Sequence, residues 1–598
     1  MRLKFKIVKL LFFFSFIVVP AHVATGQTDK KTAVVQVKFE GNQAFRDRRL
    51  LRTMITRPSS LFSKNYYHAE IFQEDLASLV SFYNRNGYLE TTVSEHKVQI
   101  DTLKKSAKIY IKIEEGEITR IEGVSVFGNE FFDEATILAN YKFRENDPFR
   151  EEKIQEAKIA ILTMYADNGF LEAEVVSEIK INAETHRALI DFLITEKCQY
   201  RIGDIAIKGN DKTKEKVIRR EILFRPNTIV RYSQLLKSQR NLYMTGLFQS
   251  IFIRPQQSKT DSTQKDILVE VKDKESTEFN VLLGYGSVDK ARGRLEAFST
   301  NLKGTARKIG ISTKLSYINQ AVEATFTEPY TFGWRWKTDM GFKYDFLDEP
   351  GYNLHRVGGR MTVGRNIKDR SNISLKFRHD KTKLSAVKVA KVPDKLISNV
   401  RSLTLSMIFD NRDNMFNSTN GFFLEWSNEI AGSFLSGSDS FARTVWRVKY
   451  FMTLSQNMVG ATALEVGWMN VIAGTKEIPL NERFYAGGPN SLRGFKYRLV
   501  GPQDINGVEL GGQFKVVWNV LEIRNTIYKM VGAAVFLDVG NVWARARAFN
   551  LNDFRWSPGF GVRVNTPLGI IRLDYAINSD NKRNEPASMF YFNMGQAF

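Results

Sequence analysis

Alternation of apolar and other residues with a period of two dominates the second half of this 598-residue chain. Starting near Thr277, apolar side chains occupy every second position, as at Phe279, Val281 and Leu283, and the pattern continues to the last residue. This period is typical of β-strands, whose successive side chains point to opposite faces. The sequence therefore predicts a large β-structure over residues 276–598.

The N-terminus predicts that the chain is exported. Basic residues precede an apolar run from Leu10 to Val19, and small residues follow up to Gly26. About ten apolar residues are too few for a membrane-spanning helix, which needs roughly 20. We therefore predict a signal peptide over residues 1–26. No later stretch reaches 18 consecutive apolar residues, so no spanning helix is predicted after it.

An exported chain with alternating strands favours a membrane barrel, although a soluble β-sandwich also alternates. In hydrocarbon, strands can satisfy all their backbone hydrogen bonds only when the sheet closes on itself. Dividing residues 277–598 by about 20 residues per strand and connection gives roughly 16 strands. The aromatic C-terminal residues supply a further barrel feature. We predict a transmembrane antiparallel β-barrel of about 16 strands.

The first half contains three internal repeats of α+β type. Residues 34–45, 118–132 and 200–213 each form an alternating segment with Gly-Asn at or near its end, at Asn42, Asn129 and Asn210. Two helical segments follow in each repeat, and the second ends at a glycine suited to a helix C-terminal cap: Gly87, Gly169 and Gly246. Two more alternating segments close each unit. The predicted order is strand, helix, helix, strand, strand.

The net charge of +21 is unevenly distributed. It is densest over residues 356–395, which carry 12 basic and 3 acidic residues. In an exported protein, lipid headgroups or glycolipid phosphates are more plausible partners than nucleic acid. A polar barrel lumen with solvated loops explains the same charge equally well, and both interpretations stay open at this point.

A glycine-rich segment, RFYAGGPNSLRGF (483–495), places Arg493 between Leu492 and the pair Gly494-Phe495. Burying a guanidinium without a carboxylate partner is costly. Two acidic residues on later strands are candidate partners. Asp538 shares a face with Phe536 by the period of two, and Glu522 lies between two apolar residues. A solvated loop residue is the alternative at this point, and the resemblance described next implies instead that Arg493 is held inside the barrel by Asp538 or Glu522, beside Phe536.

The repeats resemble POTRA (polypeptide-transport-associated) domains, and the Leu492–Phe495 segment resembles the loop motif of the outer-membrane β-barrel assembly superfamily that includes BamA and TamA. FDNRDNMFNSTNGFFLEW, FLDVGNVW and the aromatic end FYFNMGQAF resemble further segments of that family. Three repeats and this length are closest in architecture to TamA. The expected domains are POTRA repeats over 27–117, 118–198 and 199–275, followed by the barrel over 276–598.

The resemblance implies a protein of the bacterial outer membrane with its POTRA domains in the periplasm. It implies an assembly factor that receives unfolded outer-membrane proteins and helps them insert, with no enzymatic activity, cofactor or metal. Partners would be outer-membrane lipid and glycolipid, and either a TamB-like inner-membrane-anchored protein or assembly lipoproteins. A BamA-type core insertase and a two-partner secretion transporter are the alternatives.

The family mechanism also implies a lateral seam between the first and last strands. We expect it to join a segment near the start of the barrel to the C-terminal strand, and to open for a client strand. The expected seam residues are Phe279, Val281, Gly284, Gly286, Phe590, Phe592, Met594 and Phe598. Glycines weaken side-chain packing within strands, which favours opening at this position.

Overall fold

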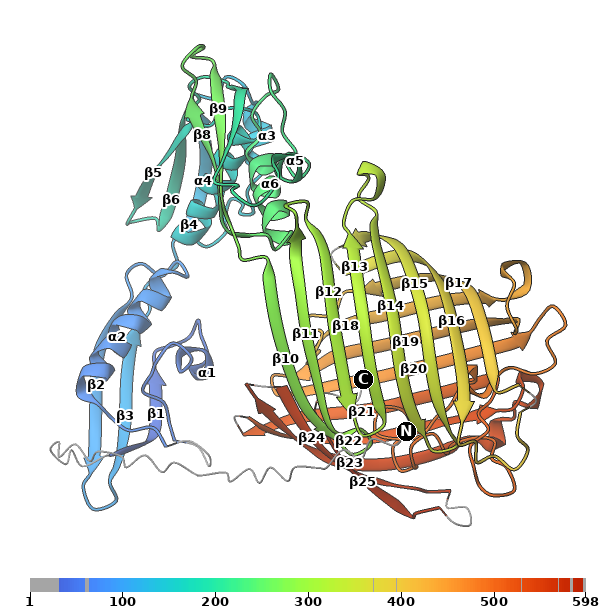
Figure 1. Cartoon of the computed structure of the whole chain (residues 1–598). Coiled ribbons are helices and arrows are strands. Elements are labelled where there is room, and N and C mark those ends of the chain that lie inside the picture. Colours follow the sequence, from blue (N-terminus) through green and yellow to red (C-terminus); the bar gives the residue numbers. More distant parts are fainter. Residues whose placement is uncertain are drawn as a thin grey trace, which may run out of the picture. The chain divides into compact units, whose positions relative to one another are not determined.

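The computed structural model describes residues 32–59, 64–368, 370–393, 395–528, 530–567, 569–580 and 585–594. The predicted signal peptide and Phe598 lie outside these residues. Three small α/β domains precede one large barrel (Figure 1). Of the described residues, those up to 165 together with 172–197 form one compact unit, while 166–171 and those from 198 onward form a second.

The first unit holds the first two α/β domains. Each pairs its first strand in parallel with its last strand, which lies at the centre of a three-stranded sheet. The elements of the first domain are β1 (Ala33–Glu40), α1 (Asp47–Leu50), α2 (Ala69–Asn84), β2 (Thr92–Asp101) and β3 (Ser106–Glu114). Those of the second are β4 (Arg120–Phe127), α3 (Glu134–Leu138), α4 (Glu151–Ala166), β5 (Glu174–Asn182) and β6 (Arg187–Thr195).

The third α/β domain belongs to the second unit and has the same element order and sheet topology. Its elements are β7 (Arg201–Lys208), α5 (Glu215–Arg219), α6 (Tyr232–Met244), β8 (Phe248–Gln257) and β9 (Gln264–Asp273). The predicted order of strand, helix, helix, strand, strand is therefore confirmed in all three domains.

The repeated Gly-Asn pair makes the same corner in each domain. Gly41 has a φ of +85°, and a Cβ there would lie 2.1 Å from the carbonyl oxygen of Ile113 in the central strand. Only glycine accepts both the backbone angle and this close approach. The following Asn42 donates from its side chain to the carbonyl of Phe45 at 2.8 Å. The same side-chain hydrogen bond recurs at the second and third corners, so the sequence repeat is a repeat of turn geometry.

Among the described residues, sixteen strands form one closed barrel in which neighbouring strands are antiparallel. The predicted fold class and strand number are confirmed. The strands are β10 (Thr277–Gly286), β11 (Lys290–Leu302), β12 (Arg307–Ser316), β13 (Asn319–Glu328), β14 (Lys337–Glu349), β15 (Tyr352–Lys368), β16 (Ser371–Ser385), β17 (Ile397–Asp410), β18 (Gly421–Ala431), β19 (Phe441–Ser455), β20 (Met458–Val471), β21 (Phe514–Tyr528), β22 (Val531–Trp543), β23 (Arg555–Thr566), β24 (Gly569–Ile577) and β25 (Ser588–Met594).

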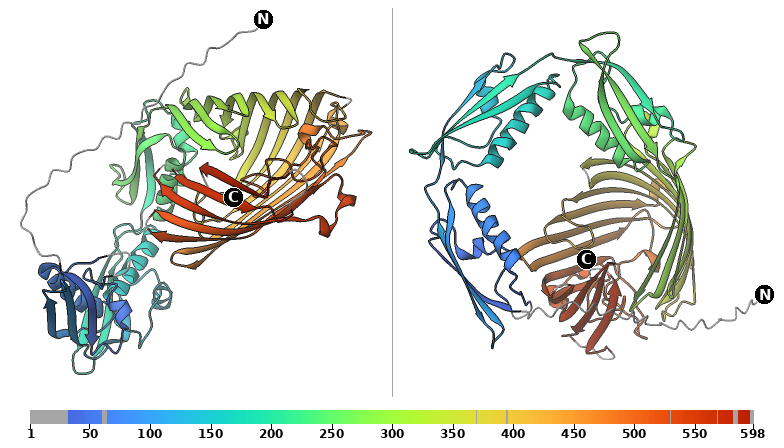
Figure 2. Two further views of the ribbon diagram at one scale, coloured as in Figure 1. Left: turned by 90° about the horizontal axis from the view of Figure 1, so that it is seen from below. Right: turned by 90° about the vertical axis from the view of Figure 1, so that its left-hand side faces the viewer.

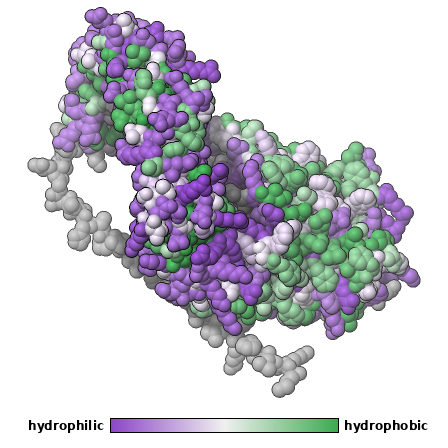
Figure 3. Space-filling model, turned by 90° about the horizontal axis from the view of Figure 1, so that it is seen from above, coloured by the Kyte–Doolittle hydropathy of each residue, from purple (hydrophilic) through white to green (hydrophobic). Residues whose placement is uncertain are grey.

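The barrel wall has an apolar outer face, which Figure 3 shows as green residues gathered over the barrel. Alternation produces this face, since exposed apolar side chains recur at every second position of β10, at Phe279, Val281 and Leu283. Acidic and basic residues of the later strands point to the opposite side and are buried, as Asp538 and Arg572 show. No helix in the described ranges is long and apolar enough to span a membrane.

The third α/β domain is joined to the barrel through the turn between β11 and β12. The backbone N–H of Lys214 donates to the carbonyl of Gly304 at 2.9 Å, and the side chain of Asn301 donates to the hydroxyl of Thr213 at 2.8 Å. Ala306 of this turn is buried within the hydrophobic core of the third domain. We call the end of the barrel that holds this turn the near end, and the opposite end the far end.

Candidate functional site: the lumen loop and the barrel seam

The longest connection of the barrel, residues 472–513 between β20 and β21, folds back into the lumen; we call it the lumen loop. It contains the whole Leu492–Phe495 motif. Leu492 is buried in a hydrophobic cluster with other loop and wall residues, and Phe495 belongs to the same cluster. The motif is therefore part of the packed interior of the barrel.

Arg493 is fully buried and lies against the inner barrel wall. Its Nε and Nη2 donate to the two carboxylate oxygens of Asp538 at 2.7 and 2.8 Å, and its Nη1 donates to Glu522 at 2.7 Å. Its backbone N–H also donates to Asp538, at 3.2 Å. The guanidinium carbon lies 3.3 Å from the centroid of the Phe536 ring. The structure thus brings Arg493 together with both candidate carboxylates, which bind it at once, and with the ring of Phe536.

Gly494 lets the loop backbone touch the wall. Its φ is +90°, and a Cβ at this position would lie 2.2 Å from the hydroxyl oxygen of Ser557 and 3.0 Å from the carbonyl oxygen of Ile577. The next residue, Phe495, accepts a hydrogen bond at its carbonyl from the hydroxyl of Tyr591 at 2.6 Å. Because Tyr591 lies on β25, the lumen loop is bonded directly to the last strand.

Further charged residues of the wall extend the network around Arg493, and sequence analysis did not select them. Asp574 lies 3.8 Å from Arg493 and binds Arg563 at 2.6 Å and Arg572 at 3.1 Å. Arg572 also donates to the Pro489 carbonyl of the lumen loop at 3.0 Å. The alternation of β24 places Arg572 and Asp574 on the lumen face, but their neighbours depend on strand register.

The lumen loop has a second ionic contact on the other side of the barrel. Glu482 accepts from Arg378 of β16 at 3.2 Å and lies 3.5 Å from Arg443 of β19. Both arginines also bind Glu429 of β18. Arg378 belongs to the basic 356–395 segment. At this residue the positive charge therefore binds acidic side chains inside the barrel and does not face lipid.

A third contact involves Arg498, whose guanidinium lies 3.5 Å from the centroid of the Tyr485 ring. It forms an ion pair with Glu349 at 2.9 Å and donates to the hydroxyl of Tyr352 at 2.9 Å. These two partners lie at the end of β14 and the start of β15. The lumen loop is therefore bound to strands on several sides of the barrel.

The seam between β10 and β25 is paired at one position only. Gly286 and Asn593 are the sole register partners in the described ranges, whereas β10 pairs with β11 along its whole length. Ser287, next to Gly286, donates its backbone N–H to the Phe592 carbonyl at 2.9 Å. Figures 1 and 2 show the green first strands and the red last strands running in different directions.

Of the other expected seam residues, Phe592 bonds to Ser287 across the seam, and Phe598 lies outside the described residues. Phe279 and Val281 occupy the near half of β10 and are 77% and 67% exposed. Gly284 pairs only with β11, and Phe590 and Met594 pair only with β24. The described pairing therefore places one contact of the seam at the far end of β10, and the predicted pairing beyond Met594 stays a prediction.

No cluster of three or more metal-ligating His, Cys, Asp or Glu side chains occurs within the described ranges. The acidic groups of the lumen are instead bound to arginines, as at Asp538 and Glu429. The chemistry of this site is ionic and hydrogen-bonding, and its geometry holds the lumen loop against the barrel wall.

Comparisons with known proteins agree with this architecture. A model described as the Omp85 superfamily domain matches residues 301–598. A POTRA model, described as a surface antigen variable number repeat, matches residues 32–116, 119–197 and 200–274.

Similar curated proteins carry the name outer membrane protein assembly factor BamA. The one from Neorickettsia risticii (strain Illinois) is 24% identical over 92% of this chain and 76% of its own length. The one from Neisseria meningitidis serogroup B is 23% identical over 95% of this chain and 78% of its own length. The crystal structure of BamA from Haemophilus ducreyi lacking POTRA domains 1–3 is 22% identical, with a TM-score of 0.67 over 76% of this chain and 95% of that one.

Proposed function

Because this chain belongs to the Omp85 superfamily, we propose that it is an outer-membrane protein assembly factor whose barrel seam accepts a strand of an unfolded client protein. The barrel lies in the outer membrane, and the α/β domains lie in the periplasm. Clients are unfolded outer-membrane proteins. The function is a non-enzymatic one, since the free energy comes from burial of the client's own apolar surface in lipid.

The edge of β10 that faces β25 is the observation that supports this proposal most strongly. Within the described residues, Gly286 is the one position from Thr277 to Gly286 with a register partner on β25. A strand edge released from its neighbour is a template for strand addition. A client strand would pair with β10 from the near end, where Phe279 and Val281 already present apolar side chains outward.

The α/β domains offer further strand edges for clients in transit. In the first domain β2 is an outer strand of the sheet, with mostly exposed residues, and β5 holds the same place in the second domain. An extended polypeptide can add to such an edge through backbone hydrogen bonds that do not depend on its sequence. This suits a protein that serves many clients.

A reversible disulfide across the seam tests the proposal. Gly286→Cys and Asn593→Cys would face each other at the single paired position, in a background in which the exposed Cys198 is changed to serine. The full chain is reconstituted in liposomes, and insertion of an unfolded outer-membrane protein is followed by protease protection. We expect insertion to fall to the rate of protein-free liposomes when the disulfide forms, and to recover on reduction.

The matched control is a disulfide between β11 and β12, which are already fully paired. Ala297→Cys and Ile311→Cys are register partners there, and locking them changes no edge. Unchanged insertion through the oxidised seam variant would refute a role for seam opening. Equal loss in the control variant would show that the disulfide acts through general stiffening of the barrel.

Within the superfamily, a TamA-like role is the narrower proposal, and the three α/β domains support it. The names of the similar curated proteins support a BamA-type core insertase instead. Affinity isolation of the full chain from membranes separates the two. A co-isolated TamB-like inner-membrane-anchored protein would support the first, and assembly lipoproteins would support the second. Secretion of one dedicated polypeptide through the barrel would support a two-partner transporter.

A further inference from the structure

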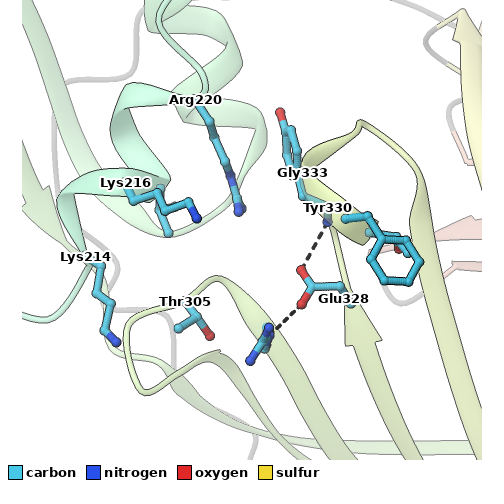
Figure 4. A pocket seen from close by; sticks show the side chains of 11 residues that line it. Lys214, Lys216, Arg220, Thr305, Glu328, Tyr330 and Gly333 are labelled. Carbon is cyan, nitrogen blue, oxygen red and sulfur yellow. Dashed lines mark hydrogen bonds and ion pairs between the residues drawn. The ribbon is translucent and has the colours of Figure 1, made fainter.

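A cavity of about 670 Å³ lies where the third α/β domain meets the near end of the barrel. Figure 4 shows Lys214, Lys216 and Arg220 of the domain facing Thr305 and Tyr330 of the barrel turns. Its volume is within the range of small-molecule sites. The lumen loop and the seam do not contribute to it, so the mechanism proposed above leaves this cavity without a role.

The cavity carries an excess of positive charge. Its lining contains four basic residues, including Arg307 of β12, and one acidic residue, Glu328 of β13. Glu328 is already fully used, since it binds Arg307 at 2.5 Å and accepts from the backbone N–H of Tyr330 at 3.2 Å. In the part of the chain that the structure describes, Lys214 and Lys216 have no acidic partner. These two lysines can therefore bind an added anion.

Arg220 is held in place but keeps an unused donor. Its guanidinium carbon lies 4.0 Å from the centroid of the Tyr330 ring, and its Nε lies 3.6 Å from Glu221. That Nε is buried and donates no hydrogen bond. Glu221 is also bound by Arg335 of the barrel turn at 3.1 Å. The guanidinium group lines the cavity over the Tyr330 ring, so its positive charge attracts an anion there.

The cavity opens on the outer face of the barrel rather than on the lumen. Arg307 and Ile309 point to the same side of β12 by the period of two, and Ile309 is exposed on the outer wall. Ile309, Phe326 and Met340 are register partners on β12, β13 and β14. They form an apolar row across the outer wall, and this row lies two residues along β12 and β13 from the Arg307–Glu328 pair. The cationic site thus borders the lipid-facing surface.

Exposed aromatic side chains lie beside the cavity on the β13–β14 turn. Phe332 is 96% exposed and Trp334 is 70% exposed. Aromatic residues at the ends of barrel strands are typical of the interface between hydrocarbon and headgroups. The cations, the aromatic residues and the apolar wall therefore lie in the order of the parts of an anionic lipid, with the cations at the phosphate and the apolar wall at the acyl chains. A soluble anion would use only the first of these.

We propose that this cavity binds the phosphate headgroup of an anionic phospholipid from the periplasmic leaflet. Lys214, Lys216 and Arg220 bind the phosphate, and the acyl chains lie along the row of Ile309, Phe326 and Met340. Because the domain and the barrel both contribute to the cavity, a bound lipid holds them together. This inference needs the barrel to lie in a membrane, but it does not depend on the assembly of client proteins.

Native mass spectrometry of the delipidated full chain in neutral detergent tests this site. The probes are dioleoyl-phosphatidylglycerol, dioleoyl-phosphatidylcholine with the same chains, and glycerol 3-phosphate. We expect the wild type to bind one phosphatidylglycerol in preference to the other two. Lys214→Gln with Lys216→Gln should weaken this binding roughly ten- to thirtyfold, since each lysine near a lipid phosphate contributes about 1 kcal/mol.

The matched control is Lys237→Gln with Lys272→Gln, which removes the same charge from exposed positions of the same domain. Its binding should stay within about twofold of the wild type, because neither lysine lines the cavity. Since both double variants lose the same net charge, a difference between them reports on the site and not on the total charge. Equal loss in both variants, or no loss in either, overturns the proposal. Equal binding of phosphatidylcholine or glycerol 3-phosphate overturns the lipid assignment, as does displacement of the lipid by an acidic peptide.

A photoactivatable phosphatidylglycerol tests the same site without any variant. Crosslinks to residues 214–220 or 330–336 of the wild type support the proposal, whereas crosslinks confined to other segments overturn it. Neither measurement contains a client protein. Failure of lipid binding would therefore leave the proposed assembly function standing, and failure of client insertion would leave this inference standing.

Discussion

Replacing Arg493 by alanine is the sharpest test of how the lumen loop is held. The change removes all three side-chain hydrogen bonds, the contact with the Phe536 ring and the positive charge between Asp538 and Glu522. Both carboxylates are fully buried. Without Arg493, Glu522 keeps its ion pair with Arg524 at 2.7 Å, whereas Asp538 keeps only the hydrogen bond from Asn519 at 2.8 Å among its described side-chain contacts. Removing one partner of a buried ion pair costs about 3–5 kcal/mol of folding stability.

Arg493→Lys separates charge from geometry. A lysine keeps the positive charge but cannot bind Asp538 through two parallel hydrogen bonds while also donating to Glu522. We expect a smaller loss of roughly 1–3 kcal/mol, comparable to one hydrogen bond to a charged group. The assay is urea-induced unfolding of the full chain in lipid vesicles, followed by tryptophan fluorescence and by heat-dependent mobility in gels.

A double-mutant cycle supplies the refutation. Arg493→Ala, Asp538→Asn and the combined variant should show a coupling free energy of roughly 0.5–3 kcal/mol, as for residues in direct contact. A simple exchange of the two charges is a poor test, since an acidic residue at position 493 would lie beside Glu522. An Arg493→Ala variant with unchanged unfolding, or a cycle with no coupling, would show that the loop is held by its other contacts.

Three further changes test other parts of the structure. Gly494→Ala should lower the barrel's free energy of unfolding by about 1–3 kcal/mol because of its φ of +90°. Adding Ser557→Ala should not restore this stability, since it leaves the backbone angle unchanged. An unchanged unfolding midpoint of Gly494→Ala would contradict the need for glycine at this position. Tyr83→Phe removes the hydrogen bond that its hydroxyl donates to Glu115 at 2.7 Å, so hydrogen exchange in the first α/β domain should report a loss of about 1.5–3 kcal/mol, and unchanged protection would refute it. Partial burial raises the pKa of Asp413, but hydrogen bonds from hydroxyl and N–H groups of its own turn outweigh this and lower it to about 2. Its contribution to stability is therefore complete above about pH 4 and is lost as the pH falls toward 2; the stability difference between wild type and Asp413→Asn should vanish in that window, and a constant difference would count against it.

Several features could be predicted because their causes are local. Each Gly-Asn corner needs a positive φ beside a carbonyl, and that need appears in the sequence as a repeated pair, as at Gly41-Asn42. The barrel could be predicted because alternation is set by neighbouring residues, and the strand number follows from chain length. Arg493 stood out because its segment, Leu492 to Phe495, resembles the loop motif of the family.

Other features could not be predicted because they depend on contacts between distant strands. Glu482 and Arg498 bind strands more than 30 residues away, and no local pattern marks their partners. The register of the seam is a further example, since no local pattern in the sequence shows that Gly286 lies opposite Asn593.

The sequence by itself determined the three repeats, the alternating strands and the identity of Arg493 with its candidate partners. These depend on backbone angles and side-chain periods, which act over a few residues. The tertiary structure alone decided that Asp538 and Glu522 bind Arg493 together, that Gly286 of β10 pairs with Asn593 of β25, and that the third domain and the barrel enclose a cationic cavity. Those outcomes follow from strand register and barrel closure, which bring together residues whose separation in the chain carries no information about their distance in space.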